Sequence, residues 1–366
     1  MKQKFPTAAH NYFKVMNLLS AKKTFLEHVT GNPVFTYRES FNINEVKSRQ
    51  KLLEKDSAAE KSMKLVEAGI ILQHNPSIKN QTAFKKFNAA YYGEPTEALL
   101  AAVLVRFDAC VSPETKDLWQ YVSRQISVDL KKADSKLWPS PQLFSEVQSW
   151  GAQYMNALFV HKEEKNLCKL FELVMQDTGL IDQGWKLHIT EDASPAKINH
   201  HTKTIWIGSL YAPRTQLGRL RIVAHELYGH ALRGKGQSTA ESEGFAVLLE
   251  QLTAETFKPR RAYRYIAAAL AWGVDGLPRD FRQTFEIMWR CMVIASKYSE
   301  ADARSYAFDE CARIFRGGIP DAPGVIYLKD ATYLPANILT WRWLESTSIS
   351  YNDFMHLASG KTRIEI

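Results

Sequence analysis

The stretch Ile222–His230, which reads Ile-Val-Ala-His-Glu-Leu-Tyr-Gly-His, is the most informative part of this chain. Two histidines lie on one predicted helix, and a glutamate follows the first of them directly. Neutral imidazoles and carboxylates in a tetrahedral array are ligands that zinc prefers. The common metal motif is H-E-x-x-H, in which both histidines share a helical face and the glutamate is the general base. Here the spacing is one residue longer, H-E-x-x-x-H.

The longer spacing has a geometric consequence. Five residues of a regular α-helix turn by about 500°, so His225 and His230 would point roughly 140° apart. They converge only if the helix widens locally to an i→i+5 turn, as in a π-bulge. We therefore predict a π-turn or an irregular turn at Leu227–His230. Gly229 is the residue expected to tolerate the distortion most easily.

A third ligand is expected shortly after the second histidine, and two carboxylates compete for this role. Ser238 and Glu241 fit a capping box as N-cap and N3 residues, which gives Glu241 a structural task. Glu243 can face inward against the first helix, and the small Gly244 after it would let the two helices approach. We therefore favour Glu243 over Glu241. The predicted site holds one Zn²⁺ per chain with His225, His230 and Glu243 as ligands and Glu226 as general base.

The flanking sequence predicts a small sheet beside this helix. Alternating apolar residues indicate strands at Trp185–Thr190 and Thr202–Gly208, with turn residues between them. Helical patterns follow at Gln216–Leu232 and Thr239–Phe257, and a strand-like piece lies at Gly324–Leu328. The second strand would border the cleft and could pair with an extended substrate.

The remainder of the chain is predicted to be mostly helical. Asn44–Leu65 and Glu97–Phe107 carry apolar residues at three- and four-residue spacing. We predict an N-terminal helical region over residues 1–165 and a catalytic region over 166–366, joined in one compact unit. The predicted fold class is α+β and predominantly α.

Composition restricts the partners and the compartment. The 366 residues carry a formal charge of +8, but no block of five or six like charges, which argues against nucleic-acid binding. The apolar stretches Ala98–Val105 and Ile266–Val274 are far shorter than the ~20 residues that span a bilayer, so no membrane partner is predicted. The N-terminus lacks the apolar core of a signal peptide. Four separated cysteines without a C-x-x-C pair indicate reduced thiols and a cytoplasmic location. The oligomeric state is not indicated.

Several motifs occur in an order that resembles a known family. The H-E-x-x-x-H motif is followed by Glu243–Ala246 (Glu-Gly-Phe-Ala), then Arg313–Gly318 (Arg-Ile-Phe-Arg-Gly-Gly) and Tyr327–Leu334 (Tyr-Leu-Lys-Asp-Ala-Thr-Tyr-Leu). Asn32–Tyr37 resembles the family's entry motif. The chain thus resembles the tyrosine/phenylalanine carboxypeptidase-like domain proteins. These include the microtubule-associated tyrosine carboxypeptidases of animals and bacterial proteins with a Gln-Glu-Gly-Leu-Ala motif.

The resemblance implies a gluzincin-like zinc metallopeptidase. It implies a carboxypeptidase that removes a C-terminal, aromatic-type residue from a peptide or protein tail. Phe245 stands where the family has Leu, and Ser242 stands where it has Gln or Glu. The stretch between His230 and Glu243 is also shorter than in the animal enzymes, so tubulin is not carried over as the substrate.

A carboxypeptidase must recognise a terminal carboxylate, a task suited to basic side chains. The candidates are Arg316, Lys329 and Arg233, and Tyr333 is the candidate donor to the oxyanion.

Two other functions fit the same residues. One is an aminopeptidase or endopeptidase that uses the same metal. The other is a non-enzymatic basic helical protein with a vestigial metal site, which would bind nucleic acid or an acidic partner. The presence of Glu226 argues against a vestigial site, because a purely structural metal needs no general base.

Overall fold

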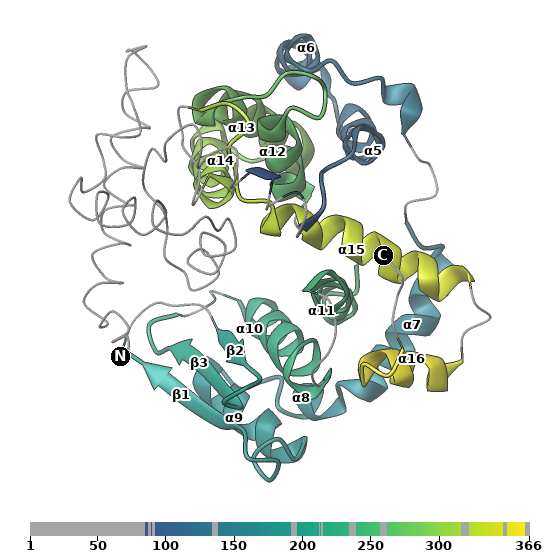
Figure 1. Cartoon of the computed structure of the whole chain (residues 1–366), viewed down its shortest axis with the longest axis vertical. Helices are drawn as coiled ribbons and strands as arrows, with labels where there is room; N and C mark the ends of the chain where they lie inside the picture. Colours follow the sequence, from purple (N-terminus) through teal and green to yellow (C-terminus); the bar gives the residue numbers. More distant parts are fainter. Residues whose placement is uncertain are drawn as a thin grey trace. The chain divides into compact units, whose positions relative to one another are not determined.

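A computed structural model describes residues 85–86, 89, 92–133, 138–191, 196–211, 213, 215–233, 239–256, 262–315, 322–346 and 350–362. Helices dominate this part of the chain, together with one three-stranded sheet (Figure 1). The predicted α-dominated α+β class is therefore confirmed. The predicted helix at 44–65 and the motif at 32–37 lie outside the described residues.

The chain divides into two compact units, each assembled from segments distant in sequence. The described part of the first unit lies within residues 136–260 and 333–366, and that of the second within 85–135 and 261–332. The first contains α7 (Pro141–Tyr154), α8 (Asn156–Val160), α9 (Leu167–Asp177), β1 (Lys186–Thr190), β2 (Lys197–Asn199), β3 (Thr204–Gly208), α10 (Gln216–Val223), η4 (Ala224–Tyr228), η5 (Ala231–Arg233), α11 (Thr239–Thr253) and α16 (Tyr351–Ala358).

The second unit is helical in its described part. It contains α5 (Glu97–Asp108), η2 (Pro113–Thr115), α6 (Lys116–Gln125), η3 (Leu130–Lys132), α12 (Ala262–Trp272), α13 (Phe281–Ser296) and α14 (Glu300–Ile314). Helix α15 (Lys329–Ser346) starts here, and its residues from Tyr333 onward belong to the first unit. The predicted helix at 97–107 is confirmed as α5. The predicted domain boundary near residue 165 stays a prediction.

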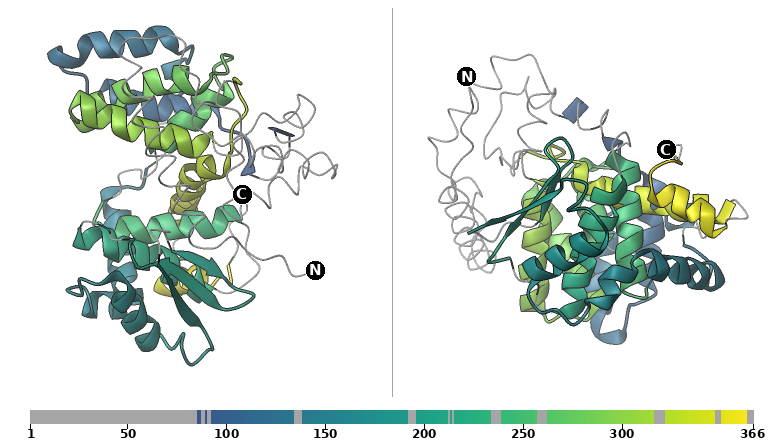
Figure 2. Two further views of the ribbon diagram at one scale, coloured as in Figure 1. Left: turned by 90° about the vertical axis from the view of Figure 1, so that its left-hand side faces the viewer. Right: turned by 90° about the horizontal axis from the view of Figure 1, so that it is seen from below.

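The sheet of the first unit has the strand order β1-β3-β2. Strand β3 pairs with β1 in parallel and with β2 in antiparallel orientation. Ile205 and Ile207 of β3 are fully buried and share a core with Val223 of α10, beside which the sheet lies (Figures 1 and 2). The sheet beside the H-E-x-x-x-H helix is thus confirmed. β2 was not predicted, because three residues are too short to show a period.

The predicted strand at Gly324–Leu328 is wrong. These residues precede α15 in the second unit, and none of them is in a strand. Val325–Leu328 is buried, and the Tyr327 N–H donates to the carbonyl oxygen of Ile314 at 2.8 Å, near the C-terminal end of α14. The apolar character that suggested a strand therefore reflects burial against a helix end.

Two glycines set the helix packing of the first unit. A Cβ on Gly229 would lie 2.5 Å from the Cβ of Ala246, and a Cβ on Gly244 would lie 2.5 Å from the Ala336 carbonyl oxygen. Gly229 has ordinary helical dihedral angles, φ −75° and ψ −32°. It is therefore needed for the close approach of α11, whereas we had expected a backbone distortion. Gly244 permits close packing against α15, not against the first helix as expected.

The exchange Gly229→Ala is expected to destabilise the protein. In an exposed helix it would stabilise by about 0.5–1 kcal/mol. Here the added methyl group would collide with the His225 carbonyl oxygen and with Ala246. Overpacking of this kind costs about 1–3 kcal/mol, which exceeds the helix-propensity gain. Urea unfolding followed by circular dichroism would measure the change, and an unfolding free energy equal to or above that of wild type would contradict it.

No helix of the described residues combines the length and apolar character that a bilayer crossing requires.

Candidate metal centre

The predicted π-turn is present. Helix α10 starts at an N-cap, Thr215, whose side chain accepts from the Gly218 N–H. The helix then widens to the π-turn η4, in which the Gly229 N–H donates to the Ala224 carbonyl oxygen at 3.0 Å. This i→i+5 bond brings residues five apart onto one face. The turn spans Ala224–Tyr228, slightly earlier than the predicted Leu227–His230.

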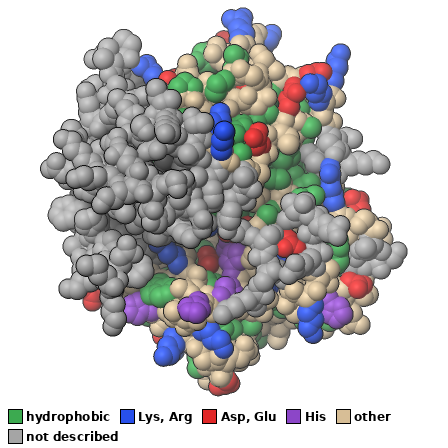
Figure 3. All heavy atoms as spheres, viewed as in Figure 1, with side chains coloured by type: hydrophobic (Ala, Val, Ile, Leu, Met, Phe, Trp, Pro, Cys, Tyr) green, Lys and Arg blue, Asp and Glu red, His purple; other side chains and the backbone are tan. Residues whose placement is uncertain are grey.

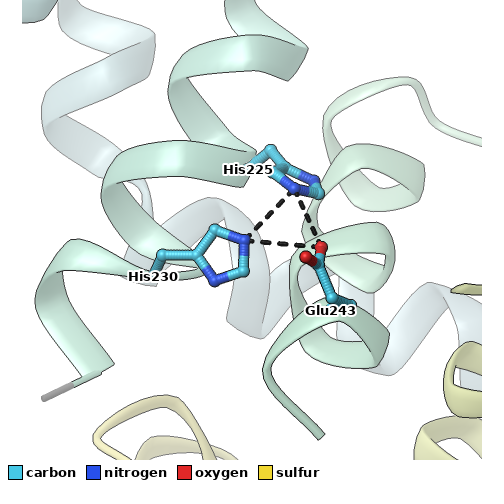
Figure 4. A group of neighbouring side chains, drawn as sticks. All are labelled: His225, His230 and Glu243. Carbon is cyan, nitrogen blue, oxygen red and sulfur yellow. Dashed lines mark hydrogen bonds and ion pairs between the residues drawn. The ribbon is translucent and has the colours of Figure 1, made fainter. Parts of the chain in front are cut away.

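His225, His230 and Glu243 converge as a result (Figure 4). The two Nε2 atoms lie 3.2 Å apart, and Oε2 of Glu243 lies 3.3 Å from Nε2 of His225 and 3.5 Å from Nε2 of His230. The histidines come from η4 and the residues just after it, and the carboxylate comes from the first turns of α11. Among the described residues, this is the one group of His, Cys, Asp and Glu side chains arranged to hold a metal ion.

The charges of His225 and Glu243 depend on the groups around them. His225 and Glu243 are each 7% exposed. Burial by itself would lower the pKa of His225, but ion pairs with Glu243 and Glu250 raise it to about 10. Burial would raise the pKa of Glu243, but the two histidines hold it well below its ordinary value. A metal ion that binds here must displace the proton of His225 and then takes over its role as counter-charge.

Two further side chains of α11 contact the histidines. Oε1 of Glu250 lies 2.8 Å from Nδ1 of His225, and the Ser242 hydroxyl oxygen lies 2.7 Å from Nδ1 of His230. The sequence reasoning missed both contacts. Glu250 follows Glu243 by two helical turns and so shares its face, a spacing that could have revealed it.

The donor set fits zinc. Two imidazole Nε2 atoms and one carboxylate oxygen leave a position open for water, the arrangement of catalytic rather than structural zinc sites. Metal-binding histidines usually donate their other N–H to a carboxylate or a similar acceptor, and both histidines have such a partner. That these residues bind a metal stays a prediction.

Glu226 and Glu241 differ in surroundings. Glu226 is partly exposed; burial raises its pKa, although His225 and His230 partly oppose this. A raised pKa suits a general base that works near neutral pH.

Glu241 is not among the convergent groups, and its carbonyl oxygen accepts from the Arg233 guanidinium at 3.0 Å. Ser238, the other half of the predicted capping box, lies outside the described residues.

The candidate substrate-binding residues and Tyr333 lie in different parts of the structure. The Arg233 guanidinium is buried 4.6 Å from the ring centre of Phe245, which is two residues, or about 200°, around α11 from Glu243. It therefore packs away from the predicted metal ligands. Tyr333 is buried on α15, one turn before the residue that contacts Gly244. Lys329, the first residue of α15, belongs to the second unit, and Arg316 lies outside the described residues.

The expected pairing of Thr202–Gly208 with a substrate strand conflicts with the topology. β3 is the middle strand, and both of its edges are occupied by β1 and β2. Only the outer strands of the described sheet could add another strand.

A His-His-Glu group with His225 and Glu243 buried and His230 partly buried, and with a second glutamate beside the first histidine, defines a candidate metalloenzyme centre. Residues 231–366 match the model of a family described as microtubule-associated tyrosine carboxypeptidase. The resemblance inferred from the motifs is thereby confirmed for this part of the chain. The match includes Glu243 and the motifs from Arg313 to Leu334, and it begins directly after His230. No curated protein and no solved structure matches the chain.

Proposed function

We propose that the protein is a zinc-dependent carboxypeptidase with a gluzincin-like catalytic unit. It removes a C-terminal, aromatic-type residue from a peptide or protein tail. The observation that carries the proposal is the convergence of His225, His230 and Glu243, with Glu226 directly after the first ligand. The description of the matching family supports the carboxypeptidase direction.

In this proposal one Zn²⁺ is held by Nε2 of each histidine and by the Glu243 carboxylate. When bound, zinc lowers the pKa of water towards ~7 and polarises the scissile carbonyl. Glu226 accepts the proton of the attacking water and later delivers it to the leaving amine. Burial of the ligands strengthens each of these electrostatic interactions, because the local dielectric is low.

The recognition of the terminal carboxylate by Arg316 and Lys329 stays a prediction. Arg233 stays behind these two candidates, because its guanidinium lies on the Phe245 ring. Tyr333 stays the candidate donor to the oxyanion. A cytoplasmic location also stays a prediction; the four cysteines are unpaired in the structure.

The rival functions receive no specific support from the described residues. In the coloured part of the face shown in Figure 3, basic side chains are scattered among acidic and apolar ones, without a continuous patch among the described residues in view. A nucleic-acid site would need such a patch or stripe. An aminopeptidase or endopeptidase with the same metal differs from a carboxypeptidase only in how it holds the substrate ends.

The test is a panel of three peptides of one sequence ending in tyrosine: one with free ends, one acetylated at the N-terminus and one amidated at the C-terminus. With zinc-loaded full-length protein, mass spectrometry should show loss of one C-terminal residue from the first two and none from the amide. Loss from the N-terminus would identify an aminopeptidase, and internal cuts an endopeptidase. A second panel varies the last residue of the free peptide. If the zinc-loaded protein cleaves none of its members, the proposal is contradicted.

A further inference from the structure

Helix α11 contributes two further side chains to the centre besides Glu243, the proposed third ligand. Glu250 and Ser242 lie against the Nδ1 atoms of the two histidines at 2.8 Å and 2.7 Å, while both Nε2 atoms face Glu243. Each imidazole is therefore fixed on both sides of its ring by groups of the same helix. The three side chains lie within nine residues of chain.

We infer that Glu250 is a positioning residue, which holds His225 with Nε2 directed at the metal, and that Ser242 does the same for His230. This inference rests on the proposed metal centre. Glu250 itself is not placed as a ligand, because it contacts Nδ1, on the opposite side of the ring from Nε2. Its carboxylate oxygen lies 2.8 Å from Nδ1 as an ion-pair partner, so that in this inference Nε2 stays free for the metal.

The burial of Glu250 supports a specific role for its carboxylate beside His225. Its exposed fraction is 3%, and a buried carboxylate is costly unless it is paired and hydrogen-bonded. A purely structural role at this point of α11 could be filled by an apolar residue of similar size. The position faces His225 because Glu250 lies on the same face of the helix as Glu243.

Substitutions of Glu250 and Ser242 are expected to lower the affinity for the metal, and to affect catalysis as a result. A carboxylate behind a ligating histidine fixes the tautomer and raises the basicity of the ligand, and its loss usually costs 10–100-fold in affinity. Glu250→Ala removes the acceptor and should approach the upper end of about 100-fold. Glu250→Gln keeps an acceptor oxygen and removes the charge, so it should lie near about tenfold. Ser242→Ala should cost less, because a hydroxyl is neutral.

The experiment uses metal-depleted full-length protein and measures the zinc Kd by competition with a chelator. Thr253→Val is the matched control, because Thr253 is also buried on α11 but its hydroxyl donates to the Leu249 carbonyl oxygen and to the Met155 sulfur, away from the histidines. Cobalt absorption spectra add a readout that a structural role would not change: the Glu250 variants should shift the ligand-field bands and the control should not. Thermal unfolding of the metal-free proteins checks that each variant folds. If Glu250→Ala does not fold, the zinc affinity of Glu250→Gln tests the inference.

Three outcomes would overturn the inference. Zinc affinity and cobalt spectra of both Glu250 variants equal to wild type would remove the positioning role and leave the metal centre standing. An equal loss of affinity in Thr253→Val would show that any change in α11 loosens the site. Wild-type protein that takes up no zinc would refute the proposed metal centre itself, and this inference with it.

Discussion

Glu226→Gln is expected to lower kcat by about 10²–10⁴-fold on a C-terminal peptide while zinc stays bound. The amide cannot accept the proton of the attacking water, but Glu226 is not among the three side chains that converge as predicted ligands. The change also removes a partly buried carboxylate whose pKa is raised by its surroundings, so the fold should tolerate it. Steady-state kinetics and zinc content by mass spectrometry would be measured on the same preparation.

Unchanged kcat in the zinc-loaded Glu226→Gln protein would remove the general-base role. Loss of zinc together with activity would instead make Glu226 a ligand. The two measurements on one sample therefore distinguish these roles.

Removing a ligand should have the second large effect. Glu243→Ala is expected to weaken zinc binding by about 10²–10³-fold, because roughly 10–16 kcal/mol shared by the four ligands of a structural zinc site gives about 2.5–4 kcal/mol per ligand. His225→Ala should do the same. Glu241→Ala, two residues earlier on the same helix, is the control and should keep zinc at about one ion per chain.

Zinc content after extensive dialysis, with chelator competition for the affinity, measures this series. Full zinc in Glu243→Ala and loss in Glu241→Ala would exchange the roles of the two glutamates. Full zinc in both, with loss in His225→Ala, would mean that the third ligand comes from elsewhere.

The sequence was most informative where chemistry restricts geometry. Two histidines five residues apart cannot share a metal on a regular helix, so the π-turn followed from spacing alone. The preference for Glu243 over Glu241 also agrees with the observed convergence. Both inferences depend on local rules of the helix, which apply whatever the remainder of the chain does.

The sequence was least informative where distant segments meet. Glycine is required at position 229 because the backbone there lies close to Ala246. It is required at position 244 because of the close contact with Ala336, nearly a hundred residues away. Likewise, the apolar run before α15 has the composition of a strand but is buried against the end of α14. Period and propensity describe one segment at a time and cannot identify its neighbour.

The arrangement of the centre on two successive helical segments has a consequence for folding. Fewer than twenty residues separate His225 from Glu243; Ser242 lies within this span, and Glu250 follows Glu243 by seven residues. The entropy of closing such a loop is small, and contacts between residues close in the chain form early. The ligands can therefore come together before the residues beyond 333 have been added to the core of the first unit. A metal ion captured at that stage would act as a nucleus for folding, in addition to its role in the finished protein.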